Sequence, residues 1–202
     1  MPTRRRAVLI LAALLLLALA SFWAALAAGS IPIAATDVLA AVLGQDAPGA
    51  DIVRQLRLPR ALAGFACGGL LALAGALMQV LLRNPLADPY ILGISGGAGV
   101  GALFAIMVGL PTLGIDGLAF TGALGAMLLV FGLAHGDGSW TQTRLLLTGV
   151  IVAAGCGALI SLMLAIAPED RLRGMLFWLS GDLGQAASAW PPLIALVVAL
   201  AL

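Results

Sequence analysis

Long uncharged apolar runs alternate with short polar connections along this 202-residue chain. A helix needs roughly 20 residues to cross a hydrocarbon core about 30 Å thick. Five runs reach that length, and a sixth starts near Trp190 and is still apolar at Leu202. The pattern predicts an all-α polytopic membrane protein with a single transmembrane domain over residues 1–202. The expected spans are residues 7–28, 61–82, 90–110, 117–134 and 145–167, with the start of a sixth at 190–202.

The polar connections contain helix start and stop signals. Arg-Asn-Pro at residues 83–85 ends the second run, and Asp-Pro at residues 88–89 opens the third. Pro-Glu-Asp at residues 168–170 follows the fifth run and predicts a short interfacial helix over residues 172–179, which is too short to span. The longest connection, residues 29–60, has room for a small surface helix.

The first run also has features of a secretory signal peptide. Three arginines precede it, and Ala25-Leu26-Ala27 is a small-residue pattern of the kind that signal peptidases cleave. The run is longer than a usual signal core, and four more complete spans follow it. We therefore predict that the first helix is retained.

Composition supports a membrane location and disfavours several functions. The chain is 62% hydrophobic and 9% charged, whereas a soluble domain carries about 25% charged residues. Its net charge of +1 gives no indication of nucleic-acid binding. Without lysine it cannot supply a Walker A lysine or a Schiff-base amine. A single histidine, His135, and two isolated cysteines, Cys67 and Cys156, predict neither a metal site nor a cofactor.

The five complete runs contain no acidic residue, arginine or histidine. A proton- or ion-coupled carrier normally keeps ionisable groups near the membrane midplane, and a channel often has rings of charge or a filter loop. An intramembrane enzyme needs a nucleophile with its base, or metal ligands. We therefore expect a transport subunit that is not an enzyme and that takes its driving energy from a partner.

The arginines do not settle the orientation when they are simply counted. With a cytoplasmic N-terminus, five arginines lie inside and five lie outside. We give the N-terminal cluster most weight, because the first helix usually dominates, and predict a cytoplasmic N-terminus. The outside arginines then need a reason other than topology. They are Arg54, Arg57, Arg60, Arg171 and Arg173.

Small residues recur every four positions in several runs, which places them on one helix face. Glycine accounts for 26 residues, nearly twice its average frequency of about 7%. Close helix packing is the expected role. The glycines to which we assign it are Gly64, Gly68, Gly101, Gly149 and Gly157. A phosphate loop is rejected for residues 93–101, because the segment lacks the Gly-Lys-Ser/Thr ending.

Two arginines directly precede the second run, in the sequence Arg57-Leu58-Pro59-Arg60. Pro59 suits a first helical turn, and a continuing turn would place Arg57 and Arg60 on one face. Guanidiniums at this position could bind a carboxylate of a partner bidentately. They could equally extend to the lipid headgroups, and these residues alone do not separate the two interpretations.

Four segments, in order from about Asp51 to Trp190, together resemble the permease subunits of ABC importers for iron-siderophores, haem and vitamin B12. They are RLPRALAGFACGGLLALAGALMQ, RNPLADPYILGISGGAGVG, TRLLLTGV and FWLSGDLG. The most specific is the second, because it lies between two apolar runs as in the family. Its motif residues are Asn84, Pro85, Pro89, Gly93, Ser95, Gly96 and Gly97.

The resemblance implies a permease of about ten helices that works as a homodimer or pseudo-dimer with a second permease subunit. A cytoplasmic ATPase dimer drives it, and a periplasmic or lipid-anchored substrate-binding protein docks through glutamates onto outward-facing arginines. Arg57 and Arg60 match the positions with that docking role. Gln142 and Thr143 match a cytoplasmic gate, where the best-known member has a small hydroxyl pair.

The family continues for about four more helices, which include the cytoplasmic loop that fits the ATPase. We therefore expect this chain to be C-terminally incomplete and not transport-competent alone. The predicted function is import of an iron-siderophore, haem or cobalamin-type chelate across the bacterial inner membrane. A non-ABC secondary carrier is the alternative, and an intramembrane enzyme is a third interpretation.

Overall fold

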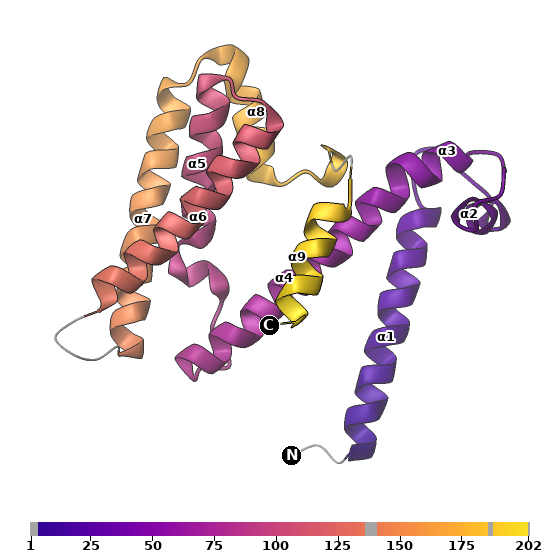
Figure 1. Cartoon of the computed structure of the whole chain (residues 1–202), viewed down its shortest axis with the longest axis horizontal. Helices are drawn as coiled ribbons and strands as arrows, with labels where there is room; N and C mark the ends of the chain where they lie inside the picture. Colours follow the sequence, from indigo (N-terminus) through magenta and orange to yellow (C-terminus); the bar gives the residue numbers. More distant parts are fainter. Residues whose placement is uncertain (1–3, 136–140, 186–187, 202) are drawn as a thin grey trace. The chain divides into compact units, whose positions relative to one another are not determined.

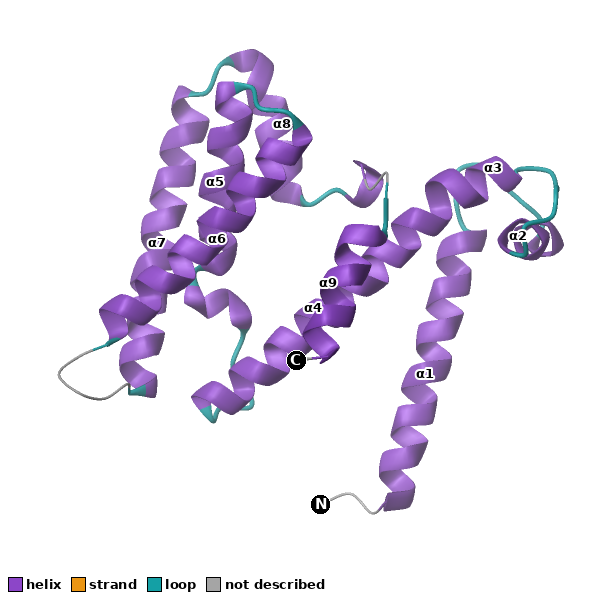
Figure 2. Cartoon of the chain, viewed as in Figure 1, coloured by secondary structure: helices purple, strands orange, loops and turns teal. Residues whose placement is uncertain are grey.

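A computed structural model describes residues 4–135, 141–185 and 188–201, and every regular element in these ranges is helical (Figures 1 and 2). This confirms the predicted all-α fold class. The elements are α1 (Arg4–Ala27), α2 (Ala35–Val42), α3 (Ala50–Ile52), the π-helical turn η1 (Val53–Arg57), α4 (Leu58–Leu82), the 3₁₀ turn η2 (Pro89–Leu92), α5 (Ile94–Val108), α6 (Thr112–Ala134), α7 (Gln142–Ile166), α8 (Glu169–Ser180), the 3₁₀ turn η3 (Leu183–Gln185) and α9 (Trp190–Ala201).

Four helical segments are long and apolar enough, by length and composition, to cross a membrane. They are Arg4–Ala27, Ala50–Leu82, Thr112–Ala134 and Gln142–Ile166. Each coincides with a run that the sequence pattern predicts. Two shorter apolar helices, α5 and α9, occupy the third and sixth runs. The helix expected at residues 172–179 is α8, which is longer because Pro168 and Glu169 start it earlier.

The third run differs from the expected single helix over residues 90–110. The chain forms the 3₁₀ turn η2, passes through Gly93 at φ +68°, and only then begins α5. Glycine adopts this left-handed conformation without a Cβ penalty, so it can redirect the chain inside an apolar run. At 15 residues, α5 alone is about 22 Å long. Hydropathy detects the apolar length of such a run but not the change of direction at one glycine.

The chain divides into two compact units, residues 1–70 with 183–202, and residues 71–182. In the first unit, the end of α1 packs with α2, α3 and η1 around fully buried Val38 and Val53 and nearly fully buried Leu26. The rings of Phe22 and Phe65 meet edge to face with centroids 5.3 Å apart. The small helix α2 therefore forms part of a buried core and does not lie freely on the surface.

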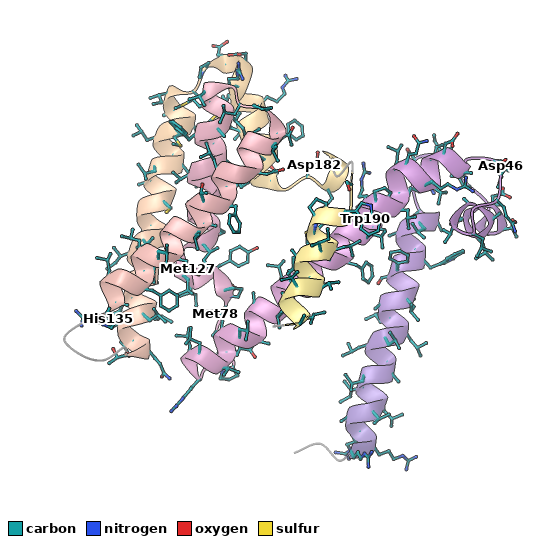
Figure 3. All side chains as sticks on the ribbon, viewed as in Figure 1. Asp46, Met78, Met127, His135, Asp182 and Trp190 are labelled. Carbon is teal, nitrogen blue, oxygen red and sulfur yellow. The ribbon has the colours of Figure 1, made fainter. Side chains whose placement is uncertain are left out.

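The second unit is built around α5, which packs against α6, α7 and α8 (Figure 1). Its buried cluster also takes in the last turns of α4, where Met78 lies (Figure 3). The cluster consists of Met78, Leu82, Ala87, Leu92, Ala126, Val130, Ala134, Leu145 and Val152. Methionine suits such a site because its flexible side chain fills irregular gaps.

Glycines bring the backbones of α5 and α6 into direct contact. A Cβ on Gly101 would overlap the backbone carbonyl of Leu118, and a Cβ on Gly122 would overlap the carbonyl of Gly97. On α7, a Cβ on Gly149 would overlap the carbonyl of Ile91. Small residues allow this approach, which gains dispersion contact along the helices.

The other glycines with an expected packing role lie in more open places. A Cβ on Gly64 would lie 3.4 Å from Leu183, which is ordinary contact. Gly68 and Gly157 have nothing within 4 Å of a Cβ among the described residues. The structure therefore places Gly101 and Gly149, but neither Gly68 nor Gly157, at close helix contacts.

Candidate functional site

The motif segment leaves α4 through two side-chain-stabilised turns. Arg83 has φ +46°, which ends the helix. Oδ1 of Asn84 accepts a hydrogen bond of 2.9 Å from the backbone N–H of Leu86. Oδ1 of Asp88 accepts one of 2.8 Å from the N–H of Tyr90, so Asp88 caps η2. Asn and Asp are suited to such turns because their short side chains reach the backbone two residues on.

These turns surround a shallow hollow of ≈ 340 Å³ lined by Leu71 and residues 85–90. Leu86 is 86% exposed and Tyr90 is 56% exposed. The only ionisable carboxylate in the lining, on Asp88, already caps η2. The hollow is therefore an apolar surface on a fixed loop, and it lacks the paired groups that acid–base chemistry requires.

Replacing Asp88 by alanine is expected to destabilise the protein by about 1 kcal/mol, because the N–H of Tyr90 at the start of η2 loses its side-chain acceptor. Thermal unfolding in detergent or lipid nanodiscs measures the effect. Asp88→Asn keeps an acceptor and should behave nearly as the parent. Asp46→Ala, at an exposed carboxylate that caps no helix, is the matched control. An Asp88→Asn variant as unstable as Asp88→Ala would exclude the capping bond as the cause.

The glycines of the motif pack against two neighbouring helices. A Cβ on Gly93 would lie 3.2 Å from the backbone nitrogen of Ala153, and one on Gly96 would lie 2.8 Å from Cβ of Cys156. Gly97 faces α6. Ser95 is exposed. The motif is thus a packing element in which Ser95 is the exposed hydroxyl.

The residues matched to the gate, Gln142 and Thr143, lie in the first turn of α7 and are exposed. Thr141 precedes them as the N-cap, accepting a bond of 3.3 Å from the N–H of Arg144. The cap fixes where the helix starts and therefore which residues occupy its first turn. Residues 136–140, which complete this connection, lie outside the described residues.

Arg57 and Arg60 lie in different environments, although both precede the second apolar run. Nη1 of half-buried Arg57 donates to the carbonyls of Leu26 and Ala27, both at 2.9 Å, and Nη2 donates to that of Ile31 at 2.5 Å. Arg60 is exposed, and its Nη2 makes one long bond of 3.3 Å to the carbonyl of Gly184.

Two further arginines also donate to helix ends, and sequence reasoning assigned them no role. Arg54 donates to the carbonyls of Ala41 and Gln45, at 2.8 and 2.5 Å, just at the end of α2. Arg171 reaches the carbonyl of Ile106 near the end of α5 at 3.5 Å. The sequence feature that could have indicated this role is the surplus of arginines in the connections predicted to lie outside. Helix C-termini leave carbonyls without partners, and arginine side chains can donate to them.

Groups that could together bind a metal ion are not gathered in the described part of the chain. No cluster of three His, Cys, Asp or Glu residues occurs there. The ion pair between Arg171 and Asp170, at 3.1 Å, joins exposed neighbours and contributes little to stability. The features that distinguish this chain are its apolar helices, the motif loop and the arginines.

Helices of this length and hydropathy define a polytopic α-helical membrane protein. Its fold is similar to a solved structure described as an inward-facing conformation of a metal-chelate type ABC transporter. The TM-score is 0.73 at 30% identity, covering 95% of this chain and 57% of that chain. The profile of the FecCD transport family matches residues 14–202. The chain belongs to the FecCD transport family.

Curated relatives include vitamin B12 import system permease proteins BtuC. That of Klebsiella pneumoniae is 40% identical over 139 residues, covering 68% of this chain and 42% of the relative. That of Salmonella newport is 39% identical over 184 residues, covering 90% and 54%. The chain spans about half the length of these relatives. The family resemblance seen in the motifs is therefore confirmed, which sets aside the secondary-carrier and enzyme alternatives.

Proposed function

We propose that this chain serves in the membrane-spanning permease of an ABC importer in the bacterial inner membrane, with its N-terminus in the cytoplasm. The observation that carries the proposal is the family match over residues 14–202, which includes the motif segment between α4 and α5. The apolar runs support it, because residues 7–28, 61–82, 90–110, 117–134 and 145–167 contain no acidic residue, arginine or histidine that could couple transport to an ion gradient. The energy would come from a cytoplasmic ATPase dimer.

The pathway in this proposal is lined with small and weakly polar residues of α7. Thr148 and Ser161 are its hydroxyl residues within the apolar run, and Oγ of Ser161 donates to the carbonyl of Gly157 at 2.9 Å. A hydroxyl that is satisfied within its own helix holds a passing solute weakly. Weak contacts suit a large chelate that must be released on the far side.

Cobalamin is the first substrate to test, since the curated relatives are named as vitamin B12 permeases. Iron-siderophores and haem are the other members of the proposed class, and the similar solved structure is described as a metal-chelate transporter. A second permease subunit and a substrate-binding protein complete the proposed assembly. Gln142 and Thr143 are proposed to take part in the cytoplasmic gate, from the first turn of α7.

Reconstitution of the full-length protein with its ATPase and binding protein in proteoliposomes tests the proposal. We expect ATP-dependent uptake of labelled cyanocobalamin, ferric siderophore or haem, offered separately. An ATPase variant that binds but does not hydrolyse ATP, and vesicles without binding protein, are the controls. Uptake driven by a proton gradient in the absence of ATP would contradict the proposal.

Docking of the binding protein is proposed to use the arginines around the start of α4. An exposed guanidinium offers a planar fork of donors that matches a carboxylate. Arg60 is exposed, and Arg57 lies one turn before it. Charge pairs of this kind steer association and weaken as salt is added.

A further inference from the structure

We propose that α2 lies on the bilayer surface at the C-terminal end of α1, and that the face carrying Leu39 and Leu43 is immersed between the lipid headgroups and the acyl chains of that leaflet. The partner of this face is a lipid surface, and no protein is required to cover it. This contact is independent of the substrate and of the protein partners proposed above.

The side chains of α2 are apolar on two faces, and protein covers only one of them. Val38 and Ala41, three residues apart, are almost completely buried in the core that contains Leu26. Leu39 and the C-cap residue Leu43, four residues apart, share another face and are 50% and 66% exposed. A helix that is apolar beyond one stripe is typically buried in a protein core or in a membrane.

The exposed face of α2 carries no charge. Val42, next to Leu43, is also exposed. Asp37 is two residues before Leu39, so a rotation of about 100° per residue places it on nearly the opposite side of the helix. Asp46 lies in the connection after α2, on the side away from the N-terminal half of α1 (Figure 3). An apolar face with charged residues only at its margins is typical of a contact surface.

The position of α2 along α1 places it at the level of a membrane surface. It shares a core with Leu26, in the last turn of a helix long and apolar enough to cross a membrane. Trp23, one turn earlier, is exposed, and indole rings gather at the membrane interface. Figure 1 shows α2 end-on and α1 lengthwise, so α2 lies across the direction of α1. A helix in the plane of the interface has this orientation.

A side chain from η1 closes the C-terminal end of α2. Nε of Arg54 donates to the carbonyl of Ala41 at 2.8 Å, and Nη2 donates to that of Gln45 at 2.5 Å. The last carbonyls of a helix have no partner within the helix, and an unpaired carbonyl is costly where lipid excludes water. These bonds make the end of α2 compatible with immersion, while the face of Leu39 and Leu43 stays open.

Spin labelling of the full-length permease in phospholipid nanodiscs tests this contact. Cys67 and Cys156 are first replaced by alanine, and a single cysteine is then introduced as Leu39→Cys or as Leu43→Cys. A nitroxide attached to that cysteine reports its collisions with oxygen, which concentrates in lipid, and with a water-soluble nickel chelate. Using two sites on one face keeps the test informative if either variant fails to fold.

Two further variants provide the references. Asp46→Cys places the label on an exposed connection and gives the collision rates in water. Val38→Cys places it on the buried face of the same helix, where we expect neither reagent to reach it. At Leu39 and Leu43 we expect a ratio of oxygen to nickel-chelate collisions that is several-fold higher than at Asp46, because the label then lies in lipid.

Nickel-chelate access at Leu39 and Leu43 equal to that at Asp46 would overturn the proposal, because the face would then lie in water. Low access of both reagents, as at Val38, would also overturn it, because protein would then cover the face. Added substrate-binding protein should leave the collision rates unchanged, and a fall for both reagents would assign the face to that partner instead. None of these results depends on uptake, so failure of the proposed transport function is seen separately.

Discussion

Changing Gly101 to alanine is expected to destabilise the second unit by about 2–3 kcal/mol, a typical cost of inserting a methyl group into a packed interior. The new Cβ would overlap the backbone carbonyl of Leu118 on α6, and a backbone atom cannot turn aside as a flexible side chain can. The two helices must therefore separate, which also loses the contacts around Gly97 and Gly122. Thermal unfolding of the full-length protein in nanodiscs gives the size of the effect.

Gly125 provides the matched control for this experiment. It lies in the same helix pair, on α6, and has nothing within 4 Å of a Cβ among the described residues. Gly125→Ala should leave stability unchanged or raise it by up to about 1 kcal/mol, because alanine is the better helix former. Equal destabilisation by both substitutions would show that the backbone contact at Gly101 is not what the methyl group disturbs.

Gly93→Ala is expected to cost about 2–3 kcal/mol through two additive causes. An alanine at φ +68° adopts a left-handed conformation that costs roughly 1–2 kcal/mol. Its Cβ would also lie 3.2 Å from the backbone nitrogen of Ala153, which is tighter than ordinary contact. Thermal unfolding again provides the measurement.

A substitution at Gly181 separates the conformational cost from the cost of the close contact. Gly181 has φ +76° and nothing within 4 Å of a Cβ among the described residues, so Gly181→Ala carries only the conformational cost. We expect Gly93→Ala to be the more destabilising of the pair by about 1 kcal/mol. If the two variants unfold at the same temperature, the contact between Gly93 and α7 contributes nothing measurable.

The sequence pattern predicted the helices well wherever one physical property decides the outcome. Hydrophobic length located the helices α4, α6 and α7, which cover the predicted runs 61–82 and 117–134 in full and all but the last residue of 145–167, because a backbone in lipid must satisfy its own hydrogen bonds. It could not locate the division at Gly93. That division depends on Asp88 and Pro89 starting a 3₁₀ turn and on the packing of Ile91 against Gly149. The second of these is a contact between distant parts of the chain, which hydropathy does not reveal.

The candidate docking residues show the same limit: local sequence predicts local spacing but not contacts with distant residues. Residue type and position identified Arg57 and Arg60 as a pair, and their spacing placed them one turn apart. Sequence spacing could not show that Arg57 meets the carbonyls of Leu26 and Ala27, which lie thirty residues or more away along the chain. Arg54 was left without a role for the same reason.

The backbone contact between α5 and α6 also restricts how this part of the protein can move. Two helices whose glycines fit against each other's carbonyls resist shear, because sliding would drive Cα atoms into backbone oxygen. We expect α5 and α6 to move as one rigid body in any conformational change of the second unit. Rotation would then be taken up at the N-terminal end of α5, where Gly93, at φ +68°, lacks the side chain that would restrict a hinge.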